Sequence, residues 1–145
     1  MPFTGNYATN TYKNGLNTGT FNLGTGTTQV FKIALYTNAA SLDYATTGYT
    51  TDGEVTDAGY TAGGEVLTIS QVPTVGSSGT TSYYSFSNVS WSGAITARGA
   101  LIYKYDSSSN PAMIVLDFGS DKVSTTTFSV QFPAATNTTA IVRIS

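Results

Sequence analysis

Apolar and polar residues alternate along much of the chain after residue 29. In the run Val30–Tyr36, the side chains of Phe31, Ile33 and Leu35 fall on one face, as a half-buried strand requires. Further runs with strand character follow, separated by Gly, Pro, Ser and Asn clusters. They are Glu65–Val72, Ser82–Val89, Ile95–Tyr105, Ala112–Phe118, Thr126–Phe132 and Thr139–Ile144. About eight short strands with this spacing predict an all-β fold, namely a jelly-roll-like antiparallel β-sandwich over residues 30–145.

Two segments do not fit the strand pattern. Residues 1–29 are rich in Gly, Asn and Thr and carry isolated apolar residues without a period of 2 or 3.6. We predict an extended N-terminal arm that lies along another surface, with Tyr7, Tyr12, Leu16 and Phe21 as interface residues; a locally packed terminus is the alternative. Residues 37–64 predict a short helix near 39–44 followed by an ordered functional loop.

The loop Asp106–Pro111 joins two strong strands and predicts a hairpin. The register that collects the most apolar side chains on one face pairs Tyr105 with Ala112, Tyr103 with Ile114, Leu101 with Leu116 and Gly99 with Phe118. In that register Arg98 lies diagonally across from Asp117. We expect these two residues to form an ion pair, structural or at an interface, and not a catalytic couple.

Composition narrows the possible chemistry. The 145 residues include no His and no Cys, which excludes the usual general base, thiolate nucleophile and thiolate or imidazole metal sites. The net charge is −2 and the six cationic residues are scattered, so we expect no nucleic-acid partner. We find neither a signal peptide nor a membrane span, and no cofactor-binding motif. We therefore expect no cofactor and no enzymatic activity.

Acidic and aromatic residues provide the remaining candidates. Asp52, Glu54 and Asp57 lie within six residues of one another, but their spacing does not match a calcium loop, so we interpret them as a solvated turn. Any two of the eight acids could in principle serve a glycosidase, yet the spacing selects no pair. Tyr83, Tyr84 and the single Trp91 occupy a polar stretch and are candidate exposed anchors.

Six short segments occur in a characteristic order. They are Ile33–Thr37, Tyr49–Thr51, Gly59–Gly64, Ala97–Tyr103, Val115–Gly119 and Gln131–Pro133. Together they resemble a group of small virion proteins of tailed bacteriophages. The resemblance covers residues 31–145 and leaves out the N-terminal segment.

The resemblance implies a structural virion protein without catalytic residues. The function it favours is a capsid cement or decoration protein, made in the host cytoplasm and located on the capsid exterior. Its partners would be the major capsid protein and further copies of itself, as a dimer or trimer. A chain with only 10% charged residues suits a surface that is covered by protein, and a neutral soluble domain is the alternative that the composition leaves open. A tail, fibre or baseplate module that contacts the host surface or a carbohydrate is the alternative.

Overall fold

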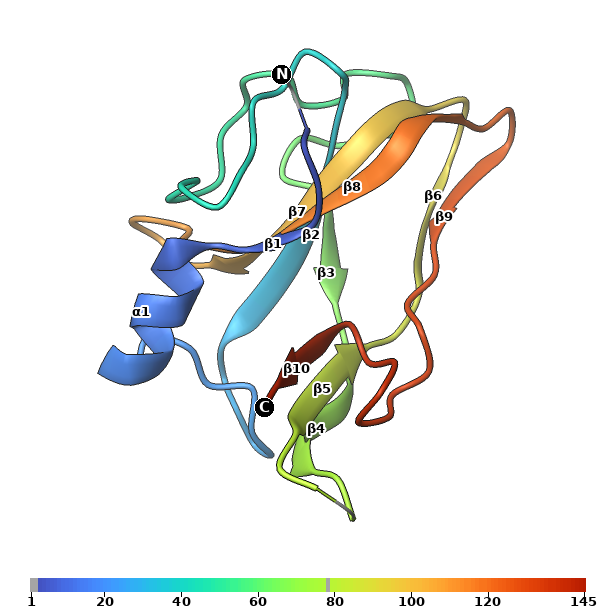
Figure 1. The fold of residues 1–145 in the computed structure, drawn as a ribbon. Coiled ribbons are helices and arrows are strands. Elements are labelled where there is room, and N and C mark those ends of the chain that lie inside the picture. Colours follow the sequence, from blue (N-terminus) through green and yellow to red (C-terminus); the bar gives the residue numbers. More distant parts are fainter. Residues whose placement is uncertain (1–2, 78) are drawn as a thin grey trace.

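The computed structural model describes residues 3–77 and 79–145, and within them the chain is an all-β protein with one helix (Figure 1). Strands hold 42% of the residues and the helix 6%, which confirms the predicted fold class. The elements are β1 (Tyr7–Ala8), α1 (Asn10–Thr18), β2 (Val30–Tyr36), β3 (Glu65–Leu67), β4 (Ile69–Val75), β5 (Ser82–Phe86), β6 (Val89–Ser92), β7 (Thr96–Tyr105), β8 (Ala112–Val123), β9 (Thr127–Val130) and β10 (Val142–Ile144).

The strands form three antiparallel sheets. The largest has the order β1-β8-β7-β2-β3, the second has the order β10-β5-β4, and the third pairs β6 with β9. In Figure 1, α1 and the β6–β9 pair lie on opposite sides of the molecule. These sheets are consistent with a sandwich, whereas the jelly-roll order stays a prediction.

The five-stranded sheet is covered on both faces. One face packs against the smaller sheets, with Ile33, Ile102, Phe86 and Phe128 in a common cluster. The other face carries a second cluster, which includes Tyr36, Leu101 and Tyr103 of the sheet together with Phe3, Ala40 and Leu42. Burial on both faces explains why β7 is an almost continuous apolar run instead of an alternating one.

The predicted hairpin exists, but its register is wrong by one residue over Gly99–Ile102 and by two at Tyr103, which pairs with Ala112. Leu101 pairs with Val115 and Gly99 pairs with Asp117. A slip of one residue moves every side chain to the other face, and this normally fixes the register of a strand. Here residues 99–103 are buried on both faces, so the apolar pattern could not distinguish the two alignments.

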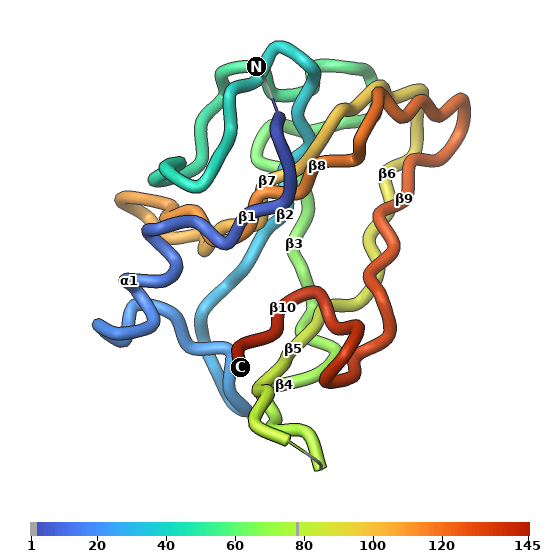
Figure 2. Tube along the Cα trace, in the orientation of Figure 1, coloured from blue at the N-terminus to red at the C-terminus, as the bar shows by residue number. Residues whose placement is uncertain are grey.

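The predicted extended arm is also wrong for the described residues of that segment, because α1 forms inside it. Residues 1 and 2 lie outside the described residues. The hydroxyl of Thr9 accepts a hydrogen bond from the Tyr12 backbone N–H at 3.0 Å, and Gly19 ends the helix in the left-handed conformation. Figure 2 follows the chain from this helix back to β2. The segment packs on its own core, since Tyr12 and Phe21 are buried there.

The short helix expected near residues 39–44 is absent, and turns replace it. The Asp43 carboxylate accepts a hydrogen bond from the Ala45 N–H, and the Thr46 hydroxyl accepts one from the Asp43 N–H. Such local side-chain bonds compete with a helix for the backbone. Within the described residues, no helix is long and apolar enough to cross a membrane.

Candidate functional site

A buried carboxylate is the most organised polar feature of the chain. Glu54 is only 6% exposed and lies beside the end of β2, where it forms a bridge with Tyr36. Its Oε1 accepts hydrogen bonds from the Tyr60 hydroxyl at 2.6 Å and from the Gly63 N–H at 2.7 Å. Its Oε2 accepts one from the Tyr49 hydroxyl at 2.7 Å. The three donors satisfy the carboxylate in place of water.

A second ring of contacts fixes those donors. The Tyr60 hydroxyl also accepts a hydrogen bond from the Leu35 N–H at 2.9 Å, and the Tyr103 hydroxyl donates to the Gly63 carbonyl at 2.8 Å. The chain reaches this position through Gly64, whose φ is +72° and whose missing Cβ leaves room for the Ile33 carbonyl. The cluster therefore ties residues 49–63 to the central strands β2 and β7.

The electrostatics of this cluster favour protonated phenols. Burial is the largest cause that raises the pKa of Tyr49 and Tyr60 above the usual range, and the hydrogen bonds to Glu54 and its negative charge raise it further. Burial and the same charge raise the pKa of Tyr103 to about 12. A tyrosinate beside a buried carboxylate is unfavourable because two like charges would share a site with little water. The three phenols therefore stay protonated near neutral pH, where their hydroxyls order the loop.

The predicted solvated turn at Asp52, Glu54 and Asp57 is wrong for Glu54. The three side chains also do not converge: Asp57 accepts a hydrogen bond from the Thr96 N–H at 2.8 Å, and Asp52 is exposed. In the part of the chain that the structure describes, no group of three or more Asp and Glu side chains is placed to hold a metal ion. The position of Tyr49 and Tyr60 five and six residues from the acid is the only sequence signal for the cluster.

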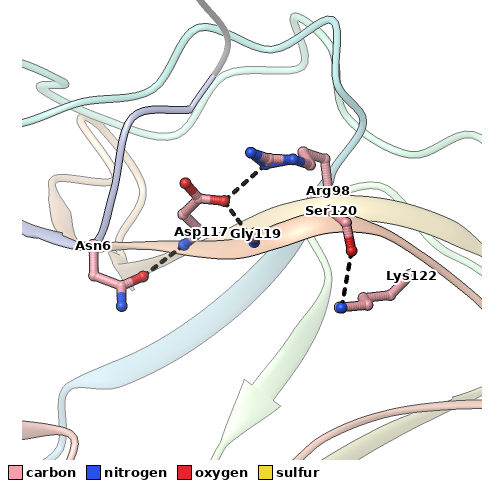
Figure 3. A network of polar contacts seen from close by, with 6 residues as sticks. All are labelled: Asn6, Arg98, Asp117, Gly119, Ser120 and Lys122. Atoms are coloured by element: carbon pink, nitrogen blue, oxygen red, sulfur yellow. Dashed lines mark hydrogen bonds and ion pairs between the residues drawn. The ribbon is translucent and has the colours of Figure 1, made fainter.

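The predicted ion pair between Arg98 and Asp117 is confirmed (Figure 3). Arg98 Nη1 lies 2.8 Å from Asp117 Oδ1, and the two side chains are 16% and 13% exposed. The same Oδ1 accepts a hydrogen bond from the Gly119 N–H. The side-chain oxygen of Asn6 accepts a hydrogen bond from the Asp117 N–H at 2.7 Å. The pair therefore anchors the N-terminal segment and the irregular part of β8 within one chain. Its role at an interface stays a prediction.

Most of the predicted aromatic anchors face inward. Tyr12, Phe21, Tyr84 and Trp91 are between 2% and 7% exposed, so their prediction as surface anchors is wrong. The hydroxyls of Tyr12 and Tyr84 lie 2.6 Å apart inside the core, and Trp91 Nε1 is buried without a hydrogen-bond partner. All four side chains belong to the core cluster between the large sheet and the elements that cover it, which a polar neighbourhood in the sequence does not show.

Three of the predicted interface residues do reach the surface. Leu16 is 38% exposed on α1, and Tyr7 and Tyr83 are half-buried. The ring of Tyr7 packs edge-on against Tyr44, which is 53% exposed. For these three, an interface role stays a prediction.

Sequence reasoning missed most of two exposed apolar areas, in which Leu16 is the one residue predicted to lie at an interface. Val30 and Tyr105 are cross-strand neighbours at the uncovered end of the five-stranded sheet, and Lys32 Nζ lies 4.9 Å from the centre of the Tyr105 ring. Leu16 and Ile144 flank a hollow of about 440 Å³ between α1 and β10. Both areas lie at the ends of strands or helices, where the apolar pattern gives no sign of exposure.

Comparisons of the chain with protein-family models, with curated proteins and with solved structures find no match.

Proposed function

We propose that the chain is a structural virion protein that attaches to the outer surface of a tailed-phage head and stabilises the shell of the major capsid protein. The sequence resemblance suggests this role. The observation that carries it is the way the folded chain uses its charged side chains.

Several carboxylates accept hydrogen bonds from the chain itself. Glu54 orders the loop before β3, Asp57 binds the Thr96 N–H, and Asp117 pairs with Arg98. The Asp106 carboxylate accepts hydrogen bonds from the backbone N–H groups of residues 108–110, and these bonds lower its pKa to about 2. Only 10% of the residues are charged, and these acids are bonded to the chain's own loops, so few charged side chains are left to face a partner. A weakly charged surface with ordered loops favours lasting contact with another protein.

The best candidate for the attachment surface is the uncovered end of the five-stranded sheet. Tyr105 is 53% exposed there, beside Val30 and the stem of Lys32. Tyrosine is enriched at the centre of protein interfaces because it combines a large apolar ring with a hydroxyl. One surface of this kind on each copy can contact the same site on every subunit of a repeating lattice.

Co-sedimentation with phage heads that lack this protein tests the proposal. We expect the purified chain to migrate with the heads at a fixed ratio to the major capsid protein. Tyr105→Asp should remove most of the binding, whereas Tyr44→Asp, which changes an equally exposed tyrosine, should leave it intact. A chain that sediments freely beside intact heads contradicts the proposal.

The carbohydrate-binding alternative loses its main support. Stacking on a sugar needs exposed aromatic rings, and two of the candidate exposed anchors, Trp91 and Tyr84, are buried. We therefore do not propose it.

A further inference from the structure

The two larger sheets leave four edge strands, namely β1, β3, β4 and β10. Edge strands offer unpaired backbone groups to other chains unless something blocks them. β4 is blocked, since Pro73 lies in it and its pairing with β5 shifts register twice. β1 is only two residues long. β3 and β10 are therefore the edges of these sheets that are open to a further strand.

The open edge β3 is acidic and apolar. Glu65 is exposed, and its side chain makes no ion pair or hydrogen bond with any residue that the structure describes; Val66 is 58% exposed. Successive side chains of a strand point to opposite faces. The edge thus presents a carboxylate on one face of the sheet and an isopropyl group on the other.

The open edge β10 has the opposite charge. Arg143 is exposed, and Ile144 is 49% exposed. The neighbouring helix α1 adds Lys13 and Leu16, and these four side chains line the same hollow. No acidic side chain lines this hollow. The edge thus presents cations together with two large apolar side chains.

The two edges lie on different sides of the molecule. β3 runs directly into β4 through Thr68 and forms one side. β10 lies beside β1 on the other side, because Ala8 and Val142 line a common hollow. A single copy therefore cannot join its own two edges, but two copies can.

We propose that β3 of one copy adds to β10 of a second copy, with Glu65 beside Arg143 and Val66 beside Ile144. A parallel alignment of the two strands places both pairs opposite each other at once. Lys13 then flanks the carboxylate, and Leu16 extends the apolar contact. Backbone hydrogen bonds supply part of the affinity, as in other cases of strand addition.

Charge selects this pairing over the others. In the same parallel alignment, two β3 edges would bring Glu65 next to Glu65, and two β10 edges would bring Arg143 next to Arg143, and both arrangements are repulsive. The strands β6 and β9 carry no charged residue that could select a partner. The exposed end of β8 is a poorer partner for β10 because Lys122 follows Asp121 there.

The contact is head-to-tail, because each copy uses two different surfaces. Such contacts build rings when the rotation closes and open filaments when it does not. The inference does not depend on attachment to a phage head. It concerns the purified chain alone.

Sedimentation equilibrium of the purified chain tests the contact. A small interface is weak, so the experiment should extend to protein concentrations of about 1 mM. We expect concentration-dependent association of the wild-type chain. Glu65→Arg and Arg143→Glu should each weaken association about tenfold, since each replaces an attraction by a repulsion. The double variant that carries both changes should restore most of the loss.

Matched controls distinguish this contact from general charge effects and from the proposed function. Asp121→Arg reverses an exposed acid outside the contact and should leave association unchanged. Val66→Asp should weaken it without affecting folding, because Val66 is exposed. Tyr105→Asp should not affect self-association even where it abolishes binding to heads. A wild-type chain that stays monomeric throughout, or a double variant weaker than either single one, overturns the inference.

Discussion

Removing one hydroxyl from the Glu54 cluster should destabilise the whole domain. In Tyr60→Phe the ring remains, while the hydrogen bond to the carboxylate and the bond from the Leu35 N–H disappear. A hydrogen bond to a charged group is worth about 1.5–3 kcal/mol, and an unpaired buried amide costs about 1–3 kcal/mol. The two effects overlap because they share one hydroxyl. We therefore expect the free energy of unfolding to fall by about 3 kcal/mol.

Urea unfolding followed by the fluorescence of Trp91 measures this loss. Trp91 is the only tryptophan and is buried 6.1 Å from the Tyr60 ring, so its emission reports on the same region. Tyr44→Phe is the control, since Tyr44 is exposed. Tyr49→Phe should fall between the two, because it removes a bond to Glu54 without leaving a backbone amide unpaired. Equal stabilities of Tyr60→Phe and the control would refute the role of the cluster.

Two further predictions concern pH and the N-terminal helix. The buried tyrosines have raised pKa values, so the stability that they contribute is complete below pH 10 and falls as the pH rises toward about 12, the pKa of Tyr103. Absorbance at 295 nm should show that these phenols ionise only together with unfolding. Gradual ionisation of a chain that stays folded would contradict this prediction. Gly15→Ala should destabilise the chain by about 1–3 kcal/mol although Ala favours helices, because its Cβ would overlap the ring of Phe21. Thermal unfolding measures that loss, and a rise in the midpoint would show that the ring moves away freely.

The apolar pattern located the strand-forming runs but neither all of their bounds nor their pairing, since the predicted run Ser82–Val89 divides into β5 and the start of β6. Val30–Tyr36 alternates at the right period and forms β2 with the predicted bounds. In β7 the residues from Gly99 to Tyr103 are buried from both sides, so no polar face remained to fix the register. Alternation carries information about pairing only where one face meets water.

The N-terminal helix was missed for a different reason. Asn10–Thr18 contains few good helix formers, and its buried face consists mainly of Tyr12 and Gly15. The helix is therefore stabilised by its cap at Thr9 and by packing on Phe21, which is a tertiary contact. Local propensity could not reveal it.

The Glu54 cluster was hidden because a sequence does not show which acid loses its water. Asp52, Glu54 and Asp57 look alike in a loop rich in turn residues, yet only Glu54 lies where two phenols and a backbone N–H converge. A single buried carboxylate without a cation needs such donors to be tolerated at all. In a chain with few charges, an acid between tyrosines is thus better interpreted as the centre of a folded loop than as a surface residue. Glu65, by contrast, is exposed and has no such donors among the described residues, so its carboxylate can meet the cation of a second copy.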